Sequence, residues 1–395
     1  MNNLHHPVWG KITVTQKFAE VINLPEVLSL QKKSQLGFKS ISINPFLTAN
    51  HNRLAHSISC MYIAEMLCDI LSENIKTSPH VKHSLMLALL LHDVGHYAFS
   101  HGVEKVSIID HEDRTTAIIR NLRSKLNNIF GFDITAYLFV LFNTNEKIIL
   151  KSIPGNEYEL LCMFRKFVSG SADIDKIEYL TTDNFLVLGK KYNFIDMYKY
   201  LSISYFKGEK VFAFDETAIK LIENLHYCRY HSHINMYILN NDVAFDIIFE
   251  SLAGLLNFSQ EEIENFTESD IKVLISSNCF NKNTEISRIC NIFEGGGDNF
   301  NIKKFRTIDE FNAFHNKILA IKSDSTNVYC KKIKVRLYKK ENETIYIKLK
   351  TGAVVDYTTV TTIPLDLVNT SYYILVDYTY DSVSNRYKFK KMFNV

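Results

Sequence analysis

Paired cysteines, long apolar runs and a dominant charge are all absent from this chain of 395 residues. Its seven cysteines are scattered singly and no CxxC pair occurs, which argues against a zinc ribbon and against a disulfide framework. The formal net charge is only +2, so no overall field favours nucleic-acid binding. No uncharged stretch reaches the roughly 18 to 20 apolar residues of a membrane span. The N-terminal MNNLHHPVWGK lacks the apolar core of a signal peptide. We therefore expect a soluble, cytoplasmic protein.

Helical periodicity extends through most of the first 250 residues. Apolar residues recur at helical spacing from Arg53 to Leu71. The segment His83–Leu91 is apolar nearly all round, which predicts a helix buried at the centre of its domain. Further helices are predicted at 25–37, 112–126, 157–168, 174–182 and 215–241, an early strand at 11–14, and later helices after the capping-box sequences SQEE (259–262) and TIDE (307–310).

The C-terminal part of the chain changes to a strand pattern. Apolar residues alternate with basic or polar ones at Ile333, Val335 and Leu337, and again at Ile345, Ile347 and Leu349. This period of two, with a polar turn between, predicts a β-hairpin, and YYILVDYTY (372–380) predicts a further strand. FEGGGDNF (293–300) is a candidate boundary. The segment KKIKVRLYKK (331–340) carries six Lys or Arg residues, which fits a solvated edge strand or, alternatively, a patch for a nucleotide effector or nucleic acid.

The segment LLHDVGHYAFSH (90–101) places a His-Asp pair, His92 and Asp93, at the end of the apolar helix. Imidazole nitrogen and carboxylate oxygen together suit a borderline divalent metal such as Fe, Mn, Zn or Co. Two adjacent residues cannot complete a coordination shell, so further ligands must come from elsewhere. His56 on the preceding helix and Asp175 at a later helix start are candidates, while Asp173 fits a helix cap better than a ligand.

These segments, taken in order, resemble the HD-domain phosphohydrolases, and most closely their deoxynucleoside triphosphate triphosphohydrolase branch. The matching motifs are HNRLAHS at 51–57, HDVGHYAFSH at 92–101, the pair His111-Glu112, and DIDKIEYLTTD at 173–183. A leader with Pro25-Glu26 and Gln35-Leu36-Gly37 matches more weakly. The resemblance covers roughly residues 7 to 250 and rests on four motifs in family order. It implies a mainly α fold: an HD-domain helical-bundle core with a smaller C-terminal α+β region.

The resemblance also implies roles for individual residues. His56, His92, Asp93 and Asp175 would hold one divalent transition metal. Those implied to surround the scissile bond are His96, His101, Glu104, His111 and Glu112, with His111 as the acid toward the leaving 5′ oxygen and Glu112 as a supporting residue. Those implied to bind substrate are Gln35, Leu36, Arg53, Lys176, Tyr179, Asp183 and Tyr230.

Within this substrate set, Arg53 and Lys176 would neutralise phosphate oxygens, and Mg²⁺ would accompany the β- and γ-phosphates. Gln35 and Asp183 would bond the sugar 3′-OH, and Tyr179 would disfavour a ribose. Structural alternatives remain open: Tyr179 can be a core aromatic, and His101 and His111 can be orienting residues. Independently of the resemblance, Asp175, Tyr179 and Asp183 are four residues apart and share one helix face.

The implied activity is hydrolysis of a dNTP to a deoxynucleoside and triphosphate through attack of water on the α-phosphorus. The alternatives are an HD phosphohydrolase for another nucleotide (a nucleoside monophosphate, a cyclic nucleotide or an alarmone) and a non-catalytic nucleotide sensor. We expect a homo-oligomer (dimer, tetramer or hexamer), no membrane partner, and no nucleic acid as the main partner, although nucleic-acid binding is kept as an alternative. Control by a regulatory nucleotide and the absence of such control are both open alternatives. The expected division is a substrate-contacting leader (1–50), the HD core (51–255), a helical extension (256–300) and a regulatory or oligomerisation region (301–395).

The chain departs from the family pattern at three places. A Tyr-x-His-Lys motif near the phosphates is matched at Tyr230, but Ser232 and His233 replace its last two residues. Leu28-Ser29-Leu30 stands where Gln-Arg-Leu is usual, and Asn23 stands where some members carry a guanine-reading Asp. These departures concern the triphosphate grip and regulation, and they leave the expected metal ligands intact.

Overall fold

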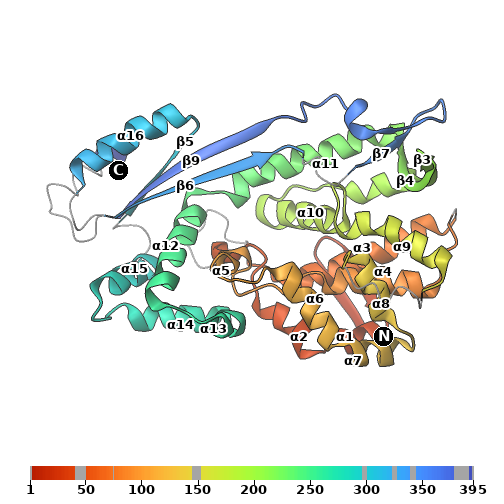
Figure 1. Ribbon diagram of the computed structural model, residues 1–395, viewed down its shortest axis with the longest axis horizontal. Coiled ribbons are helices and arrows are strands. Elements are labelled where there is room, and N and C mark those ends of the chain that lie inside the picture. Colours follow the sequence, from red (N-terminus) through yellow and green to blue (C-terminus); the bar gives the residue numbers. More distant parts are fainter. Residues whose placement is uncertain are drawn as a thin grey trace.

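Helices make up most of the fold, and small sheets extend from them at the C-terminal end (Figure 1). The computed structural model describes residues 2–40, 50–73, 75–144, 153–295, 300–322, 327–338, 344–377 and 391–393. A mainly α protein with a smaller C-terminal β region, as the sequence predicts, is therefore confirmed. The Gly-rich segment 296–299, within the predicted boundary, lies outside the described residues.

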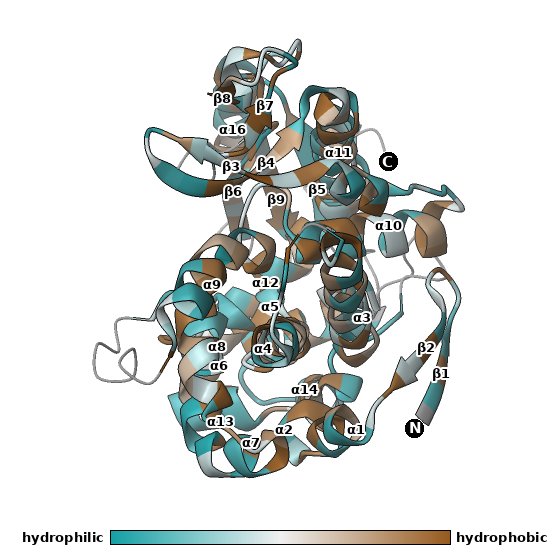
Figure 2. Cartoon of the chain, turned by 90° about the vertical axis from the view of Figure 1, so that its right-hand side faces the viewer, coloured by the Kyte–Doolittle hydropathy of each residue, from teal (hydrophilic) through white to brown (hydrophobic). Residues whose placement is uncertain are grey.

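The central bundle is built around α3 (Arg53–Leu71) and α4 (Pro79–Leu91). Asn52 caps α3 by accepting a hydrogen bond from the Ala55 N–H, while α4 begins at a proline after the capping residue Ser78. Figure 2 shows α4 end-on between α3 and α8 (Ile134–Leu141), and its residues from Leu85 to Leu91 are all buried. The prediction of a central apolar helix is confirmed.

The bundle is completed by shorter helices, several of which differ from the predicted bounds. The predicted helix 112–126 is divided at Leu122, and the predicted helix 25–37 ends at Leu28 and continues as a 3₁₀ turn. The remaining helical elements of this part are α1 (Gln16–Ile22), α2 (Pro25–Leu28), η1 (Ser29–Lys32), η2 (Gly37–Ser40), α5 (His101–Glu104), α6 (His111–Asn121), α7 (Arg123–Phe130), α9 (Gly155–Val168), α10 (Ile174–Leu188), η4 (Phe194–Tyr200), η5 (Glu216–Ala218), α11 (Ile219–Ser232) and the π-helical turn η6 (His233–Tyr237).

One helix among the described residues, α3, is long and apolar enough to cross a membrane by length and composition. Its most apolar stretch is 61% buried inside the fold, as expected for the core helix of a soluble protein.

A helical extension follows the bundle. It comprises α12 (Asn240–Leu256), α13 (Gln260–Asn265), α14 (Glu268–Asn278) and α15 (Thr284–Gly295), which lie together beside α5 in Figure 1. The predicted capping box at Ser259 is confirmed, since its hydroxyl accepts from the Glu262 N–H and the Glu262 carboxylate accepts from the Ser259 N–H. At the TIDE sequence only half of the box forms: Thr307 accepts from the Glu310 N–H.

In the part of the chain that the structure describes, three sheets complete the fold. The N-terminal pair is β1 (Asn2–His6) and β2 (Gly10–Val14); the four-stranded sheet has the order β3 (Leu201–Phe206), β4 (Glu209–Asp215), β7 (Tyr346–Lys348) and β8 (Val354–Asp356); the three-stranded sheet has the order β5 (Phe300–Phe305), β9 (Val368–Asp377) and β6 (Asn327–Arg336). Helix α16 (Ile308–Ile321) packs on the last sheet, and η7 (Tyr357–Thr359) follows β8.

The predicted hairpin between the segments around 333 and 347 is wrong in its pairing. Strand β6 pairs with β9, whereas β7 pairs with β4 in parallel and with β8 antiparallel. Alternation along a strand specifies which face is buried but not which strand lies beside it. β6 is an edge strand whose Lys332, Lys334 and Arg336 are exposed, while Lys331 lines a cavity described below.

Candidate functional site

Four side chains from three helical segments converge at the C-terminal end of α4. The His56 Nε2 atom lies 3.3 Å from His92 Nε2 and 3.1 Å from Asp175 Oδ1. Asp93 adds Oδ1 at 3.4 Å from His92 Nε2 and Oδ2 at 3.6 Å from His56 Nε2. Ligand atoms held about 2.1 Å from one ion lie roughly 3.0 to 3.5 Å apart in octahedral or tetrahedral geometry. The distances among these four groups, 3.1 to 3.7 Å, are close to that range. His56, His92 and Asp175, with Cys60, form a group that could hold a metal ion.

Both histidines are oriented by hydrogen bonds at their other ring nitrogen. His56 Nδ1 donates to the carboxylate of Glu178, and His92 Nδ1 donates to the Leu89 carbonyl at 2.8 Å. These contacts place the ring protons on Nδ1 and leave the Nε2 lone pairs directed at the shared space. This is the arrangement that metal-binding histidines require.

Glu178 was not assigned a role from the sequence, yet it lies at the centre of a buried network. Its Oε1 accepts hydrogen bonds from Thr182 Oγ1 at 2.6 Å and from the indole Nε1 of Trp9 at 3.2 Å. Burial opposes its ionisation, but the neighbouring His56 holds the pKa of Glu178 below its usual value. The N-terminal β1–β2 hairpin, through Trp9, thus helps to orient a candidate ligand on α3. In the sequence, the separation of four residues between Glu178 and Thr182 was the signal that could have indicated this network.

The charges at this centre also suit a cation. Although burial opposes ionisation, Arg53 and the neighbouring imidazoles hold the pKa of Asp93 well below its usual range. The neighbouring His56 and His92 likewise outweigh burial and hold the pKa of Asp175 well below its usual range. Cys60 also approaches, with Sγ 3.6 Å from His56 Nε2, but burial raises the pKa of its thiol. Two ionised carboxylates therefore fit the ligand set better than a protonated thiol does.

Three further histidines gather beside the first group. The ring centroids of His96 and His111 are 3.9 Å apart, and that of His101 lies 5.0 Å from His96. Glu104 links two of them, with Oε2 2.6 Å from His101 Nδ1 and Oε1 2.5 Å from His111 Nδ1. These hydrogen bonds outweigh burial and hold the pKa of Glu104 well below its usual range. Burial and the nearby Arg53 lower the pKa of His96, which keeps that ring neutral.

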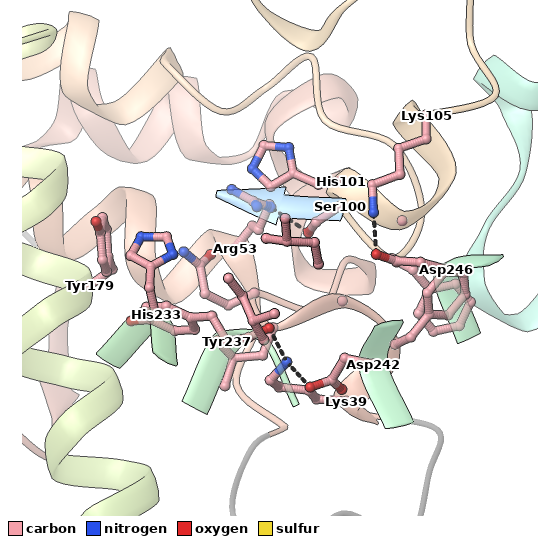
Figure 3. Close-up of a pocket in the computed structure, with 18 of the residues that line it drawn as sticks. Lys39, Arg53, Ser100, His101, Lys105, Tyr179, His233, Tyr237, Asp242 and Asp246 are labelled. Atoms are coloured by element: carbon pink, nitrogen blue, oxygen red, sulfur yellow. Dashed lines mark hydrogen bonds and ion pairs between the residues drawn. The ribbon is translucent and has the colours of Figure 1, made fainter. Parts of the chain in front are cut away.

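A cavity of about 610 Å³ opens beside both groups (Figure 3). Of the residues predicted to bind substrate or metal or to act in catalysis, those that line it are Gln35, Leu36, Arg53, His101, Asp175, Lys176 and Tyr179. Six cations, Lys39, Arg53, Lys105, Lys176, Arg229 and Lys331, outnumber three carboxylates, Asp175, Asp242 and Asp246. Such a lining favours a polyanionic ligand.

Five of the six cations are ion-paired within the protein: Lys39 with Asp242, Lys105 and Lys331 with Asp246, Arg53 with Asp93, and Lys176 with Asp173. The pairs of Lys39 and Lys105 are drawn in Figure 3. Lys176 is held by the Gly170 carbonyl at 2.8 Å and by Asp173 at 2.7 Å. Asp173 is the N-cap of α10, accepting from the Lys176 N–H at 2.8 Å, so its predicted capping role is confirmed. Although burial opposes protonation, Asp173 raises the pKa of Lys176, which therefore remains charged.

Asp183 is close to this cavity but already has partners. Its Oδ1 lies 2.7 Å from His51 Nε2, and its Oδ2 accepts from the Tyr237 hydroxyl at 2.7 Å. The Gln35 side-chain oxygen is buried with no hydrogen-bond partner among the described residues, although Gln35 lines the cavity. Tyr179 meets Tyr237 edge-on, with ring centroids 6.0 Å apart.

Two predicted site residues are not brought to this centre. Tyr230 packs against Val335, Leu337 and Ile363 under the C-terminal sheet, and Glu112 is exposed in the first turn of α6. Adjacent residues of an α-helix point about 100° apart around its axis. Tyr230 therefore faces away from the cavity that its neighbour Arg229 lines.

The residues of this segment that do line the cavity are Arg229, His233 and Tyr237, which follow one another at intervals of four. That spacing is the sequence signal that would have identified them, as it did for Asp175 and Tyr179.

The chain is similar to known proteins in part of its sequence and in its fold. Residues 53–152 match the HD domain family. The uncharacterized protein YwfO of Bacillus subtilis is 26% identical over 239 residues, which is 58% of this chain and 50% of that protein. The uncharacterized protein MG461 of Mycoplasma genitalium is 24% identical over 300 residues, 70% of this chain and 67% of that protein. The deoxynucleoside triphosphate triphosphohydrolase SAMHD1 of Xenopus laevis is 33% identical over 104 residues, 26% of this chain and 16% of that protein.

Solved structures share the fold over nearly the whole chain. A phosphohydrolase from Bacteroides thetaiotaomicron superposes with a TM-score of 0.74 at 17% identity, covering 95% of this chain and 99% of that one. A hypothetical protein from Aquifex aeolicus also gives 0.74, at 19% identity, covering 98% of this chain and 100% of that one. The chain spans about half the length of YwfO. The match to the HD domain family thus lies within a fold that extends to both sides of it and that these solved structures share.

Proposed function

We propose that this protein is a metal-dependent phosphohydrolase of nucleotides, and specifically a dNTP triphosphohydrolase that releases a deoxynucleoside and intact triphosphate. The convergence of His56, His92, Asp93 and Asp175 beside a cationic cavity carries the proposal. The activities named for SAMHD1 from Xenopus and for the Bacteroides protein are consistent with it.

The four ligand groups would hold one divalent transition ion, Fe, Mn, Zn or Co. When bound, such an ion would lower the pKa of the water that attacks the α-phosphorus. The spacing of the ligand atoms and the two oriented histidine Nε2 atoms support this assignment. Mg²⁺ would enter with the β- and γ-phosphates as part of the substrate.

The protein's own cations would neutralise charge on the phosphates. Arg53 is held by Asp93 and by Ser100 Oγ, which lies 2.6 Å from its Nε, so its guanidinium has a fixed direction at the cavity wall. Lys176 and Arg229 line the same cavity. Because phosphoryl transfer needs positioning and charge neutralisation above all, these three cations are the residues we expect to lower the barrier.

A proton must reach the leaving 5′ oxygen. We assign this step to His101 rather than to His111, which the resemblance suggested, because His101 lines the cavity. Its Nδ1 is held by Glu104, so its Nε2 is the atom free to hold and deliver the proton. His111 and His96 would orient the group from behind, through Glu104 and through ring contact.

The nucleoside would be recognised by other residues at this cavity. The unpartnered oxygen of Gln35 suits a sugar hydroxyl, and Tyr179 is placed to pack against C2′ and exclude a ribose. Asp183 would bond the 3′-OH by exchanging one of its present partners, His51 or Tyr237. Assembly as a homo-oligomer with a regulatory nucleotide belongs to the same proposal, and light scattering with and without dNTPs tests it.

The decisive test is product analysis. Purified protein is incubated with each dNTP, Mg²⁺ and Mn²⁺, Fe²⁺ or Co²⁺, and the products are separated by ion chromatography. We expect tripolyphosphate and deoxynucleoside in equal amounts. Release of orthophosphate or pyrophosphate would contradict attack at the α-phosphorus and point to another nucleotide. Binding of dNTPs without turnover under every metal would point to a nucleotide sensor.

A further inference from the structure

Glu268, in the first turn of α14, reaches from the helical extension to two loops of the bundle. Its Oε1 accepts hydrogen bonds from the backbone N–H of Ser34 at 2.5 Å and of Phe99 at 3.1 Å. Its Oε2 accepts from the Ser34 hydroxyl at 2.7 Å. One carboxylate thus joins three chain segments that are far apart in the sequence.

Both loops held by Glu268 carry residues of the proposed active site. Ser34 precedes Gln35 and Leu36, and Phe99 precedes Ser100 and His101; the residues that follow each anchor line the cavity. Glu268 is therefore bonded directly before the residues that we assign to the sugar and to the leaving group.

The two loops are also joined to Arg53. Ser100 Oγ donates to the Ser34 carbonyl at 2.6 Å and accepts from Arg53 Nε at 2.6 Å. The Arg53 backbone N–H donates to the Lys33 carbonyl at 2.9 Å. A shift of either loop would therefore turn the Arg53 guanidinium, which we assign to the phosphates. It would also disturb the ion pair between Arg53 and Asp93.

The backbone at this junction is under constraint. Phe99 and Ser100 have φ values of 50° and 55°, in the left-handed region that residues with a side chain rarely occupy. Phe99 is fully buried, so its N–H needs an acceptor inside the protein, and Glu268 supplies it. The loops approach so closely that a Cβ atom on Gly37 would lie 2.9 Å from the Phe99 carbonyl oxygen.

Helix α14 does not need Glu268 for its own formation. Its N-terminus is satisfied by a capping box between Thr267 and Asp270, and its apolar face is anchored by Ile271 and Ile275 in a buried cluster that includes Phe99. The three hydrogen bonds of Glu268 therefore act on the loops rather than on the helix that carries it.

We propose that Glu268 is a positioning residue that fixes the Ser34–Leu36 and Phe99–His101 loops, so that Arg53 and His101 address one substrate. The helical extension is then part of the catalytic unit and not merely attached to it. The kinetic part of this inference rests on the proposed function, whereas the geometric part concerns the loops alone.

Kinetics test the positioning role. Glu268→Ala removes all three hydrogen bonds, and we expect kcat to fall about 100-fold, as for an active group misplaced by about 1 Å. Glu268→Gln keeps one acceptor oxygen and should retain at least about a tenth of the wild-type kcat. Exposed Glu261 on α13 is the matched control, and Glu261→Ala should leave kcat unchanged.

The melting temperature and the metal content decide between positioning and mere stability. Positioning predicts that kcat falls in Glu268→Gln, by no more than about tenfold, while the melting temperature and the metal content stay at the wild-type values. Wild-type kcat in Glu268→Ala, or a loss of turnover in both variants that only follows unfolding or loss of metal, would overturn the inference.

Hydrogen exchange separates this inference from the proposed function. In Glu268→Ala, amide exchange in a peptide covering Phe99 should accelerate at least about tenfold. In Glu268→Gln the acceleration should be smaller. Exchange in α9 should not change in either variant. This measurement needs no substrate. If the wild type does not hydrolyse dNTPs but exchange accelerates, only the proposed function fails; if dNTPs are hydrolysed and exchange is unaltered, only the role of Glu268 fails.

Discussion

Replacing Glu178 with Gln should weaken metal binding although Glu178 is not itself a ligand. Its Oε2 accepts from His56 Nδ1, and its Oε1 accepts from Thr182 and from Trp9. His56, Thr182 and Trp9 all donate hydrogen bonds to Glu178, and the indole N–H of Trp9 cannot act as an acceptor. An amide has only one accepting oxygen, so neither orientation of the substituted side chain reproduces the network.

The two orientations fail in different ways. If the amide oxygen faces His56, the amide NH₂ meets the Trp9 N–H. If the amide NH₂ faces His56, it requires a lone pair on Nδ1, and the ring proton moves to Nε2, the atom directed at the shared space. Loss of such a supporting carboxylate typically weakens metal affinity by about 10- to 100-fold, or about 1.4 to 2.7 kcal/mol.

The assay is titration of metal-free protein with Mn²⁺ or Zn²⁺ against a chelator of known affinity. Glu157→Gln is the matched control, because Glu157 is also buried and accepts a hydrogen bond from Tyr137. These two residues lie on α9 and α8, which carry none of the four proposed ligands. The control should bind metal like the wild type. Equal affinity in Glu178→Gln and Glu157→Gln would refute the assignment of His56 as an oriented ligand.

Three further predictions test the fold, the specificity and the acid stability. Gly95→Ala places a Cβ atom 2.2 Å from the His111 carbonyl oxygen, so calorimetry should show destabilisation of at least about 2 kcal/mol, whereas Gly254→Ala, which meets nothing within 4 Å, should be neutral or stabilising. Tyr179→Ala should raise turnover of rNTPs relative to dNTPs at least about tenfold in competition assays; an unchanged ratio would assign the ring to packing alone. Burial, with Arg229 and Lys176 nearby, lowers the pKa of His226 to about 3. Between about pH 6.5 and pH 3, therefore, His226 binds a proton in the unfolded chain but not in the folded protein. The free energy of unfolding should fall over this range by up to about 1.4 kcal/mol for each unit of decreasing pH. Urea unfolding of His226→Gln should therefore show a flatter acid slope, and an identical slope would contradict the buried neutral imidazole.

The sequence predicted the helices, and the positions of candidate ligands on them, whose signals are local. Arg53–Leu71 has the predicted bounds because a capping Asn precedes an apolar periodic run. Asp175 and Tyr179 share a face because four residues make about one helical turn. His92 and Asp93 lie at the end of α4 because its apolar run ends there.

Features that depend on tertiary contacts were missed. Glu178 and Glu268 are ordinary helix residues in the sequence, and only the fold brings them to His56 and to Phe99. The pairing of β6 with β9 rather than with β7 is of the same kind, because alternation does not encode a neighbour. Tyr230 was chosen by a motif, but the turn of α11 puts Arg229 at the cavity instead.

The most direct test of the metal centre is a crystal structure with anomalous data collected at the absorption edges of Fe, Mn, Co and Zn. The account predicts one ion about 2.0 to 2.2 Å from Nε2 of His56 and His92 and from carboxylate oxygens of Asp93 and Asp175. A structure in which those four side chains bond only to one another, with the ion absent or held elsewhere, would contradict it.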